Sequence, residues 1–143
     1  MGLPTSSLTK LQGIQHATAR TILGMRKINH ITSALIDLHG LPIQQMILYK
    51  LLFYTWKAFH NQAPGYVCQM LVPLVHKRFL CSNDEMHIMV PRTNLKSYGN
   101  RAFIVVTPCT WNDLPSDIKS QDNRDKFKRM IKTHLFHCAF ERI

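Results

Sequence analysis

The sequence predicts a small, mainly α-helical domain. Its 143 residues and apolar fraction of 45% suit one globular unit that can bury a core. Apolar residues recur every three or four positions over long stretches, and glycines and prolines lie at the ends of those stretches. We therefore expect about five helices, and the 74–101 segment is the one place where a short β-hairpin fits. We expect a single domain over 1–143, with a helical part at 1–73, an irregular segment at 74–107 and a tail at 108–143.

The first helix is predicted over residues 6–25. Ser6 or Ser7 is a suitable cap, and Gly24 is a suitable end. The core-facing side is expected to hold Leu8, Leu11, Ile14 or Gln15, Thr18 or Ala19, and Ile22.

A short second helix is predicted over residues 29–40. Asn29 or Thr32 would cap it, and Gly40 would end it. Its apolar face would comprise Ile31, Leu35 and Leu38.

Residues 43–59 form the strongest predicted helix, with Pro42 at its first turn. Apolar side chains cover most of its circumference, which is typical of a helix at the centre of a domain. Lys50 and Lys57 lie on one stripe of it. These two lysines and two glutamines argue against a membrane span.

Two less regular stretches follow. The sequence predicts a short helix that Pro64 opens and that closes before Pro73. Within the 74–101 segment, "HIMVP" and "NLKSYG" are the candidate strands, with a turn at "PRTN" between them.

The stretch "PCTWNDLP" predicts another short helix. Thr107 would cap it, Pro108 would occupy its first turn, and Pro115 would stop it. Trp111 and Leu114 would face the core, and the Asn-Asp pair between them would bond nearby backbone.

The last predicted helix begins after Asp122 or Asn123, either of which can cap it. It is amphipathic. The inward arc would hold Phe127, Met130, Ile131, His134, Leu135 and Cys138. The outward arc would hold Lys126, Lys128, Arg129 and Lys132.

The charge balance favours a polyanionic partner. Eighteen Lys and Arg oppose eight Asp and Glu, for a formal charge of +10. Such an excess attracts nucleic acid first and acidic membrane surfaces second, while a solvated basic face with no partner is the alternative. The candidate nucleic-acid-binding residues are Arg20, Arg26, Lys27, Lys77, Arg78, Arg92, Lys96, Tyr98, Arg101, Lys126, Lys128, Arg129 and Lys132.

No enzyme motif is present: the sequence lacks GxSxG, a P-loop, GxGxxG and HExxH. Zinc is the metal to consider, because "HLFHC" brings His134, His137 and Cys138 together and Cys109 would be a fourth ligand. Structural zinc sites usually use two ligand pairs at short spacing, and no second pair exists here. We therefore expect no metal, no cofactor and no catalytic residue.

The four cysteines are scattered without a CxxC pair, and the N-terminus lacks an apolar signal region. We expect reduced, mostly buried thiols and an intracellular protein, nuclear or cytoplasmic.

Five stretches, in order, carry a family resemblance. Two stretches each match a family pattern in all but one defined position: "LQGIQHATAR" matches L-Q-x-[IV]-Q-x-x-A-x-R, and "HITSALIDLHGLPI" matches H-I-T-x-x-L-x-x-L-H-W-L-P-[IV]. "KAFHNQAPGYV", "VPRTNLKSYGNRAF" and "WNDLP" with "FKRMIKTHLF" match further patterns. Together, from Leu8 to Phe136, the chain resembles the C-terminal part of the reverse transcriptase of non-LTR, LINE-type (jockey-like) retrotransposons.

Besides Thr18 in the first stretch, three departures from the family pattern stand out. Gly40 stands where the family has tryptophan, Thr110 stands where it has leucine, and Gly13 replaces a basic residue. The [FY]-A-D-D palm motif, whose aspartates bind the catalytic metals, does not occur in the sequence.

The resemblance implies a non-catalytic segment of an RNA-directed DNA polymerase: the end of the thumb, at residues 1–73, plus the tail. It implies non-specific binding of RNA or DNA, and the remainder of the polymerase as the original docking partner. The alternative is a helical protein–protein interaction module with no nucleic-acid role. No membrane partner is expected.

Overall fold

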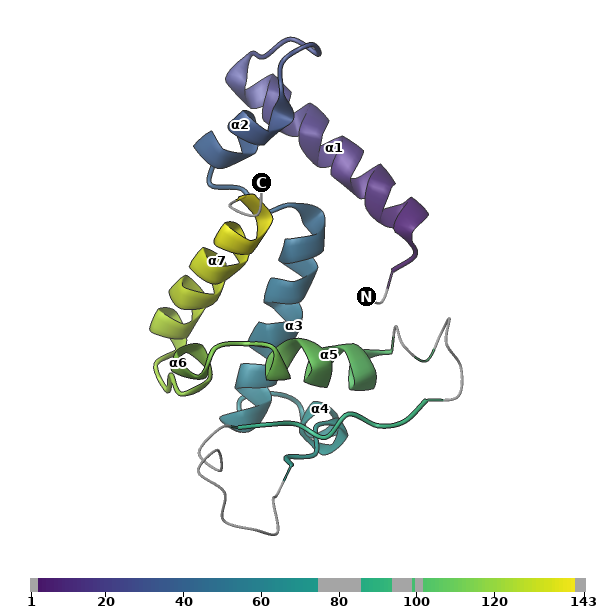
Figure 1. The fold of residues 1–143 in the computed structure, drawn as a ribbon, viewed down its shortest axis with the longest axis vertical. Coiled ribbons are helices and arrows are strands. Elements are labelled where there is room, and N and C mark those ends of the chain that lie inside the picture. The colour runs from purple at the N-terminus through teal and green to yellow at the C-terminus, as the bar shows by residue number, and fades with distance from the viewer. Residues whose placement is uncertain (1–2, 75–85, 94–98, 100–101, 141–143) are drawn as a thin grey trace. The chain divides into compact units, whose positions relative to one another are not determined.

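The structure is a computed structural model that describes residues 3–74, 86–93, 99 and 102–140 (Figure 1). The chain is mainly helical, as predicted. Seven helices occur in the described residues: α1 (Thr5–Leu23), α2 (Ile31–Asp37), α3 (Ile43–Phe59), α4 (Gly65–Met70), α5 (Phe103–Asn112), α6 (Ser116–Lys119) and α7 (Arg124–Phe140). None of them is long and apolar enough to cross a membrane.

The chain divides into two compact units. Residues 50–130 form the first, here called the central unit for its place in the sequence. Residues 3–49 and 131–143 form the second, here called the terminal unit. The helices α3 and α7 each contribute residues to both units.

The terminal unit begins with α1, whose end is the predicted one. Gly24 adopts the left-handed conformation (φ 62°), and the next residue, Met25, donates its N–H to Arg20 O at 2.9 Å. The predicted serine cap is wrong, because the helix already begins at Thr5 after Pro4 and no side chain caps it. The fixed φ of proline suits a position at the start of a helix. The first N–H groups of a helix have no partner within the helix, whether or not a side chain caps them.

The predicted core-facing side of α1 is correct only in part: Leu8 and Gln15 are half-buried and Ala19 is buried, but its other large apolar members are not. Leu11, Ile14 and Ile22 are exposed, and Ala19 is the helix's one fully buried residue among those described. The side of α1 that faces its own unit carries glutamines. Gln12 Oε1 accepts a hydrogen bond from the first backbone N–H of α3 at Ile43 (2.8 Å), and Gln15 Nε2 donates to Leu41 O (2.8 Å). These bonds satisfy groups at the start of α3 that the helix itself cannot satisfy.

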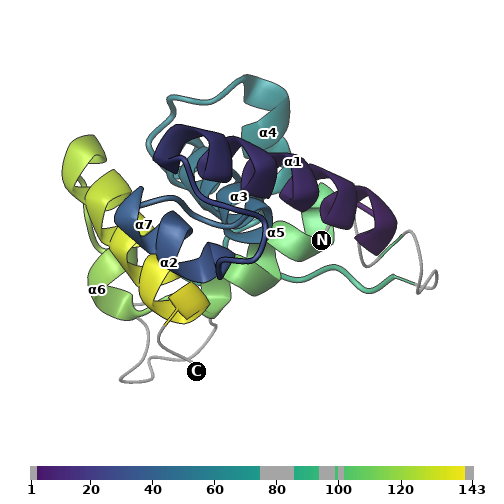
Figure 2. The same ribbon diagram turned by 90° about the horizontal axis from the view of Figure 1, so that it is seen from above.

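Helix α2 lies against α1 (Figure 1 and Figure 2). Neither Asn29 nor Thr32 caps it, since its N-cap is His30 without a side-chain bond. The predicted stop at Gly40 is displaced: the left-handed residue is His39 (φ 49°), and Gly40 donates its N–H to Leu35 O at 2.8 Å. Leu35 is buried and Ile31 half-buried, but Leu38 is exposed.

The central unit has an aromatic core. Phe127 of α7 lies between two tryptophans, with ring centroids 5.4 Å from Trp56 and 6.1 Å from Trp111. Phe59 packs on Trp111 at 5.2 Å. Each indole N–H reaches a backbone carbonyl at 2.7 Å, Trp56 at Gln121 O and Trp111 at Met86 O. The polar edge of each buried ring is therefore satisfied.

The predicted boundaries of α3 and α4 are correct, and those of α5 are not. Helix α5 starts at Phe103, so Thr107 is no cap and Pro108 lies inside the helix. The helix continues through this proline because Val105, Val106 and Trp111 are buried, and their burial outweighs the lost hydrogen bond. Trp111 and Leu114 are buried, as predicted. Instead of ending the helical region, Pro115 precedes the short α6.

No β-hairpin occurs in the described residues of the 74–101 segment. "HIMVP" instead makes a single antiparallel bridge between Ile88 and Pro73, while most of "NLKSYG" lies outside the described residues. The bridge is flanked by two backbone hydrogen bonds, from Leu74 N–H to His87 O (2.8 Å) and from Met89 N–H to Val72 O (2.9 Å). The Asn112 side chain bonds both backbone groups of Ile88.

The three described cysteines, Cys68, Cys109 and Cys138, are free thiols. The prediction that they are mostly buried is wrong for them, since Cys109 is exposed and the other two are half-buried.

Candidate nucleic-acid interface

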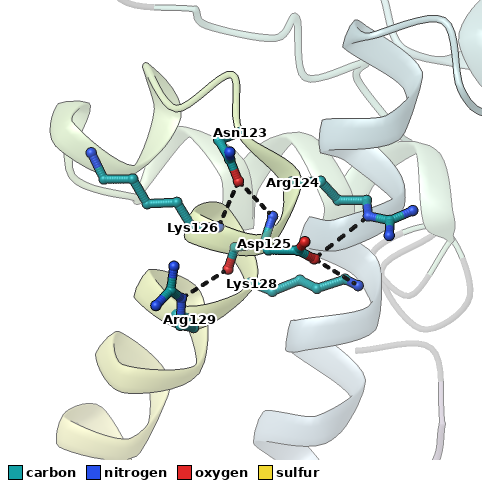
Figure 3. Close-up of polar contacts among 6 residues, drawn as sticks. All are labelled: Asn123, Arg124, Asp125, Lys126, Lys128 and Arg129. Carbon is teal, nitrogen blue, oxygen red and sulfur yellow. Dashed lines mark hydrogen bonds and ion pairs between the residues drawn. The ribbon is translucent and has the colours of Figure 1, made fainter.

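The first turn of α7 organises the largest group of predicted contact residues (Figure 3). Asn123 caps the helix, as predicted: its Oδ1 accepts hydrogen bonds from Asp125 N (3.0 Å) and Lys126 N (3.1 Å). Such a cap fixes where the helix starts and therefore the direction of each following side chain. Figure 3 shows that Arg124 and Lys128 extend toward α3, whereas Lys126 and Arg129 extend away from it.

One carboxylate holds the cations that extend toward α3. Asp125 Oδ1 lies 3.7 Å from Arg124 Nε and 3.6 Å from Lys128 Nζ. All three side chains contact solvent, so each pair is weak and can exchange for another anion. The prediction that Lys128 belongs to the open outer arc is wrong, because its side chain is half-buried toward α3.

Helix α3 supplies aromatic rings and a further cation to the same place. Lys128 Nζ lies 5.1 Å from the centroid of the Phe53 ring, and Lys57 Nζ lies 5.0 Å from it. Lys57 Nζ is also 5.8 Å from the Tyr54 ring, which is 47% exposed. We call this group the α3–α7 basic surface: Phe53, Tyr54, Lys57, Arg124 and Lys128. All five belong to the central unit.

The sequence analysis predicted only Lys128 of this surface and missed the other four members: Phe53, Tyr54, Lys57 and Arg124. A signal was present, because Phe53 and Lys57 are four residues apart on a predicted helix and therefore share a face. Whether this face of α3 contacts α7 depends on tertiary packing. The spacing of residues along the sequence does not reveal that packing.

The other α7 cations point into solvent. Lys126 and Arg129 are exposed, and Arg129 Nε makes one long bond to Asp125 O (3.4 Å). Lys132 is exposed further along α7, where the helix belongs to the terminal unit.

The remaining predicted contact residues lie on separate segments. Arg92 is exposed in the central unit, and Arg26 and Lys27 are exposed neighbours in the turn after α1. Arg20 is half-buried, and its Nε is buried without a hydrogen-bond partner in the described structure. Five others lie outside the described residues: Lys77, Arg78, Lys96, Tyr98 and Arg101.

Two side chains in the histidine–cysteine stretch of α7 lie close together, His134 and Cys138. His134 Nε2 lies 3.7 Å from Cys138 Sγ, and His137 is exposed. Burial, and secondarily the charge of His137, lower the pKa of His134. Across the described residues, no group of three potential metal ligands comes together.

The α3–α7 basic surface combines phosphate-binding and base-stacking groups. Arginine and lysine neutralise phosphates, and an exposed tyrosine ring stacks on an unpaired base. Three cations oppose one carboxylate here, and the whole chain carries +10. Searches of protein-family models, curated proteins and solved structures returned no significant match to this chain.

Proposed function

We propose that this chain is the thumb end and tail of a LINE-type retrotransposon reverse transcriptase, and that it binds RNA or DNA without sequence specificity rather than catalysing a reaction. The five collinear sequence motifs support the origin. The α3–α7 basic surface supports the binding. The palm aspartates that would bind catalytic metals do not occur in these residues, so the proposed role is to hold template and primer.

The main observation behind the proposal is that Lys57 and Lys128 both lie over the Phe53 ring. Arg124 shares the Asp125 carboxylate with Lys128, and the exposed Tyr54 ring lies beside Lys57. A polyphosphate backbone releases condensed counterions when such cations replace them, and this entropy gain requires no base-specific contact. Asp125 holds two of the cations in place and is displaced from them when phosphate arrives. The tyrosine ring adds stacking with any unpaired base, because every base has an aromatic face.

Filter binding of single-stranded RNA and of duplex DNA over a series of salt concentrations tests the proposal. We expect log affinity to fall linearly with log salt. The triple variant Lys57→Gln, Arg124→Gln, Lys128→Gln should lower the slope by about 2–3, since each lost phosphate contact removes roughly 0.7–0.9. Tyr54→Ser should weaken binding of single-stranded RNA by about 1–3 kcal/mol and leave duplex DNA nearly unchanged.

The matched control is Lys10→Gln, Arg26→Gln, Lys27→Gln, which removes the same charge from exposed positions of the terminal unit. If both triple variants reduce the slope equally, the net charge and not the α3–α7 basic surface is responsible. If the wild-type protein retains neither nucleic acid at low salt, the proposed function is wrong.

A further inference from the structure

Helix α1 presents several large apolar side chains outward. The exposed fractions are 41% for Leu11, 64% for Ile14 and 65% for Ile22. Two glutamines that would normally face solvent instead bond backbone groups near the start of α3: Gln12 accepts from Ile43 N–H, and Gln15 donates to Leu41 O. Scattered exposed leucines need no explanation, but a helix that turns polar residues inward and apolar residues outward does.

The threonines of α1 strengthen the apolar character of this side. Thr18 Oγ1 donates to Ile14 O at 3.0 Å, and Thr21 Oγ1 donates to Ala17 O at 2.9 Å. Both hydroxyls are thus satisfied within the helix, and each side chain offers its methyl group to solvent. We call this surface the outer α1 face: Leu11, Ile14, Thr18, Thr21 and Ile22.

Cations flank the outer α1 face at both ends. Lys10 lies one turn before Ile14, and Arg26 and Lys27 follow the end of the helix; all three are exposed. The first acidic residue of the sequence is Asp37, so no carboxylate from residues 1–36 compensates these charges. The face is therefore apolar along its length and positive at its ends.

We propose that the outer α1 face binds an acidic amphipathic helix of a partner protein. An apolar stripe of that helix would cover Leu11, Ile14 and Ile22, and its carboxylates would pair with Lys10, Arg26 and Lys27. From Leu11 to Ile22 the face extends about 16 Å, which three turns of a partner helix cover.

Charge favours this occupant over a second copy of the chain. In an antiparallel pair of α1 helices, Lys10 of one copy would face Arg26 and Lys27 of the other, and like charges would repel. A parallel pair would place each cation beside its own equivalent. The face also lacks the aromatic anchors of membrane-surface helices, since residues 1–36 contain no Phe, Trp or Tyr.

A designed peptide pair tests the proposal on the full chain. The probe is an amphipathic peptide of about 18 residues with a leucine stripe flanked by glutamates, and the comparison peptide has lysines in place of the glutamates. Fluorescence anisotropy measures Kd for both. We expect the glutamate peptide to bind at least tenfold more tightly than the lysine peptide.

Variants then separate the apolar and the charged contributions. Ile14→Gln with Ile22→Gln should weaken binding of the glutamate peptide at least tenfold, and Arg26→Gln with Lys27→Gln should weaken it about threefold at low salt and less at high salt. Tyr66→Gln, an equally exposed position on α4, and Lys126→Gln with Arg129→Gln on α7 should leave Kd unchanged. Circular dichroism should show the same helix content for all of them.

Three outcomes overturn the proposal. The first is failure of the glutamate peptide to bind, or binding that the isoleucine variants do not weaken. The second is dimerisation in sedimentation that these variants abolish, which would assign the face to a second copy. The third is binding to phosphatidylserine vesicles that these variants abolish, which would assign it to a membrane surface.

Discussion

Asn112 bonds both backbone groups of Ile88: its Oδ1 accepts from Ile88 N and its Nδ2 donates to Ile88 O, each at 2.9 Å. The Asn112 amide thus makes the two backbone hydrogen bonds that a neighbouring strand would otherwise make with Ile88. Beside it, Trp111 Nε1 donates to Met86 O at 2.7 Å. Two adjacent side chains at the end of α5 therefore hold an extended segment 24 and 25 positions earlier in the sequence.

Replacing Asn112 should destabilise the central unit. Asn112→Ala leaves the N–H and C=O of buried Ile88 without these partners, and each unpaired buried group costs about 1–3 kcal/mol. We expect a loss of about 2–4 kcal/mol in the free energy of unfolding, measured by urea denaturation. The neighbouring variant Asp113→Ala, at an exposed position, should stay within about 0.5 kcal/mol of wild type. Equal effects of the two variants would show that the amide contributes nothing specific.

Trp111→Ala should be more costly, because the side chain is 1% exposed and packs on Phe59 and Phe127. We expect a loss of about 3–5 kcal/mol by the same denaturation. Trp111→Phe keeps most of the packing and removes the bond to Met86, so its loss should be smaller. A loss under about 1 kcal/mol for the alanine variant would contradict the role of Trp111 as a core anchor.

Removing the carboxylate of the α3–α7 basic surface should strengthen nucleic-acid binding. Asp125→Asn frees Arg124 and Lys128 from their ion pairs, each of which is worth about 1 kcal/mol or less at the surface. We expect affinity for single-stranded RNA at low salt to rise about two- to fivefold. Asp117→Asn on α6 makes the same charge change at another exposed carboxylate and should raise affinity less. An equal rise in both variants would indicate a response to net charge alone.

Acid should destabilise the terminal unit through His134. Burial and the nearby His137 lower the pKa of His134 below its ordinary value of 6.5, so the folded state binds a proton less readily than the unfolded chain. The contribution of neutral His134 to the free energy of unfolding is complete above pH 6.5. It is lost as the pH falls through 6.5 toward the lower folded-state pKa. Burial and Arg20 act in the same direction on His16.

His134→Gln should flatten this pH dependence in unfolding experiments between pH 7 and 5, roughly the range in which an ordinary histidine titrates. His30→Gln, at an exposed histidine, should preserve it. A steeper dependence in the His134 variant would contradict the direction of the shift.

Local sequence signals predicted most helix positions correctly. Residues 43–59 form a helix with the predicted ends, Asn123 caps α7, and Gly24 ends α1. Each of these signals acts within a few residues: apolar periodicity, a side chain that bonds the first free N–H groups, and a glycine that accepts a left-handed conformation.

The incorrect predictions share a different cause. Thr107 and Pro108 are typical of a helix start, yet α5 runs through them because burial of its apolar side chains outweighs one missing hydrogen bond. "HIMVP" has the pattern of a hairpin strand, yet its backbone partners are the Asn112 side chain and a single bridge. In each case a contact distant in sequence overrides a local preference.

The sequence by itself determined that this protein is helical and strongly basic, and where α3 and α4 begin and end, because those properties depend on composition and on neighbours three or four residues apart. Only the tertiary structure decided which cations share a surface and which face of α1 is exposed. Lys57 meets Lys128 across the Phe53 ring from a helix more than sixty positions away, and Gln12 rather than Leu11 faces its own unit. The reason is physical: a periodic pattern defines the faces of a helix, but the satisfaction of buried backbone groups and the packing of neighbouring elements select the face that turns inward.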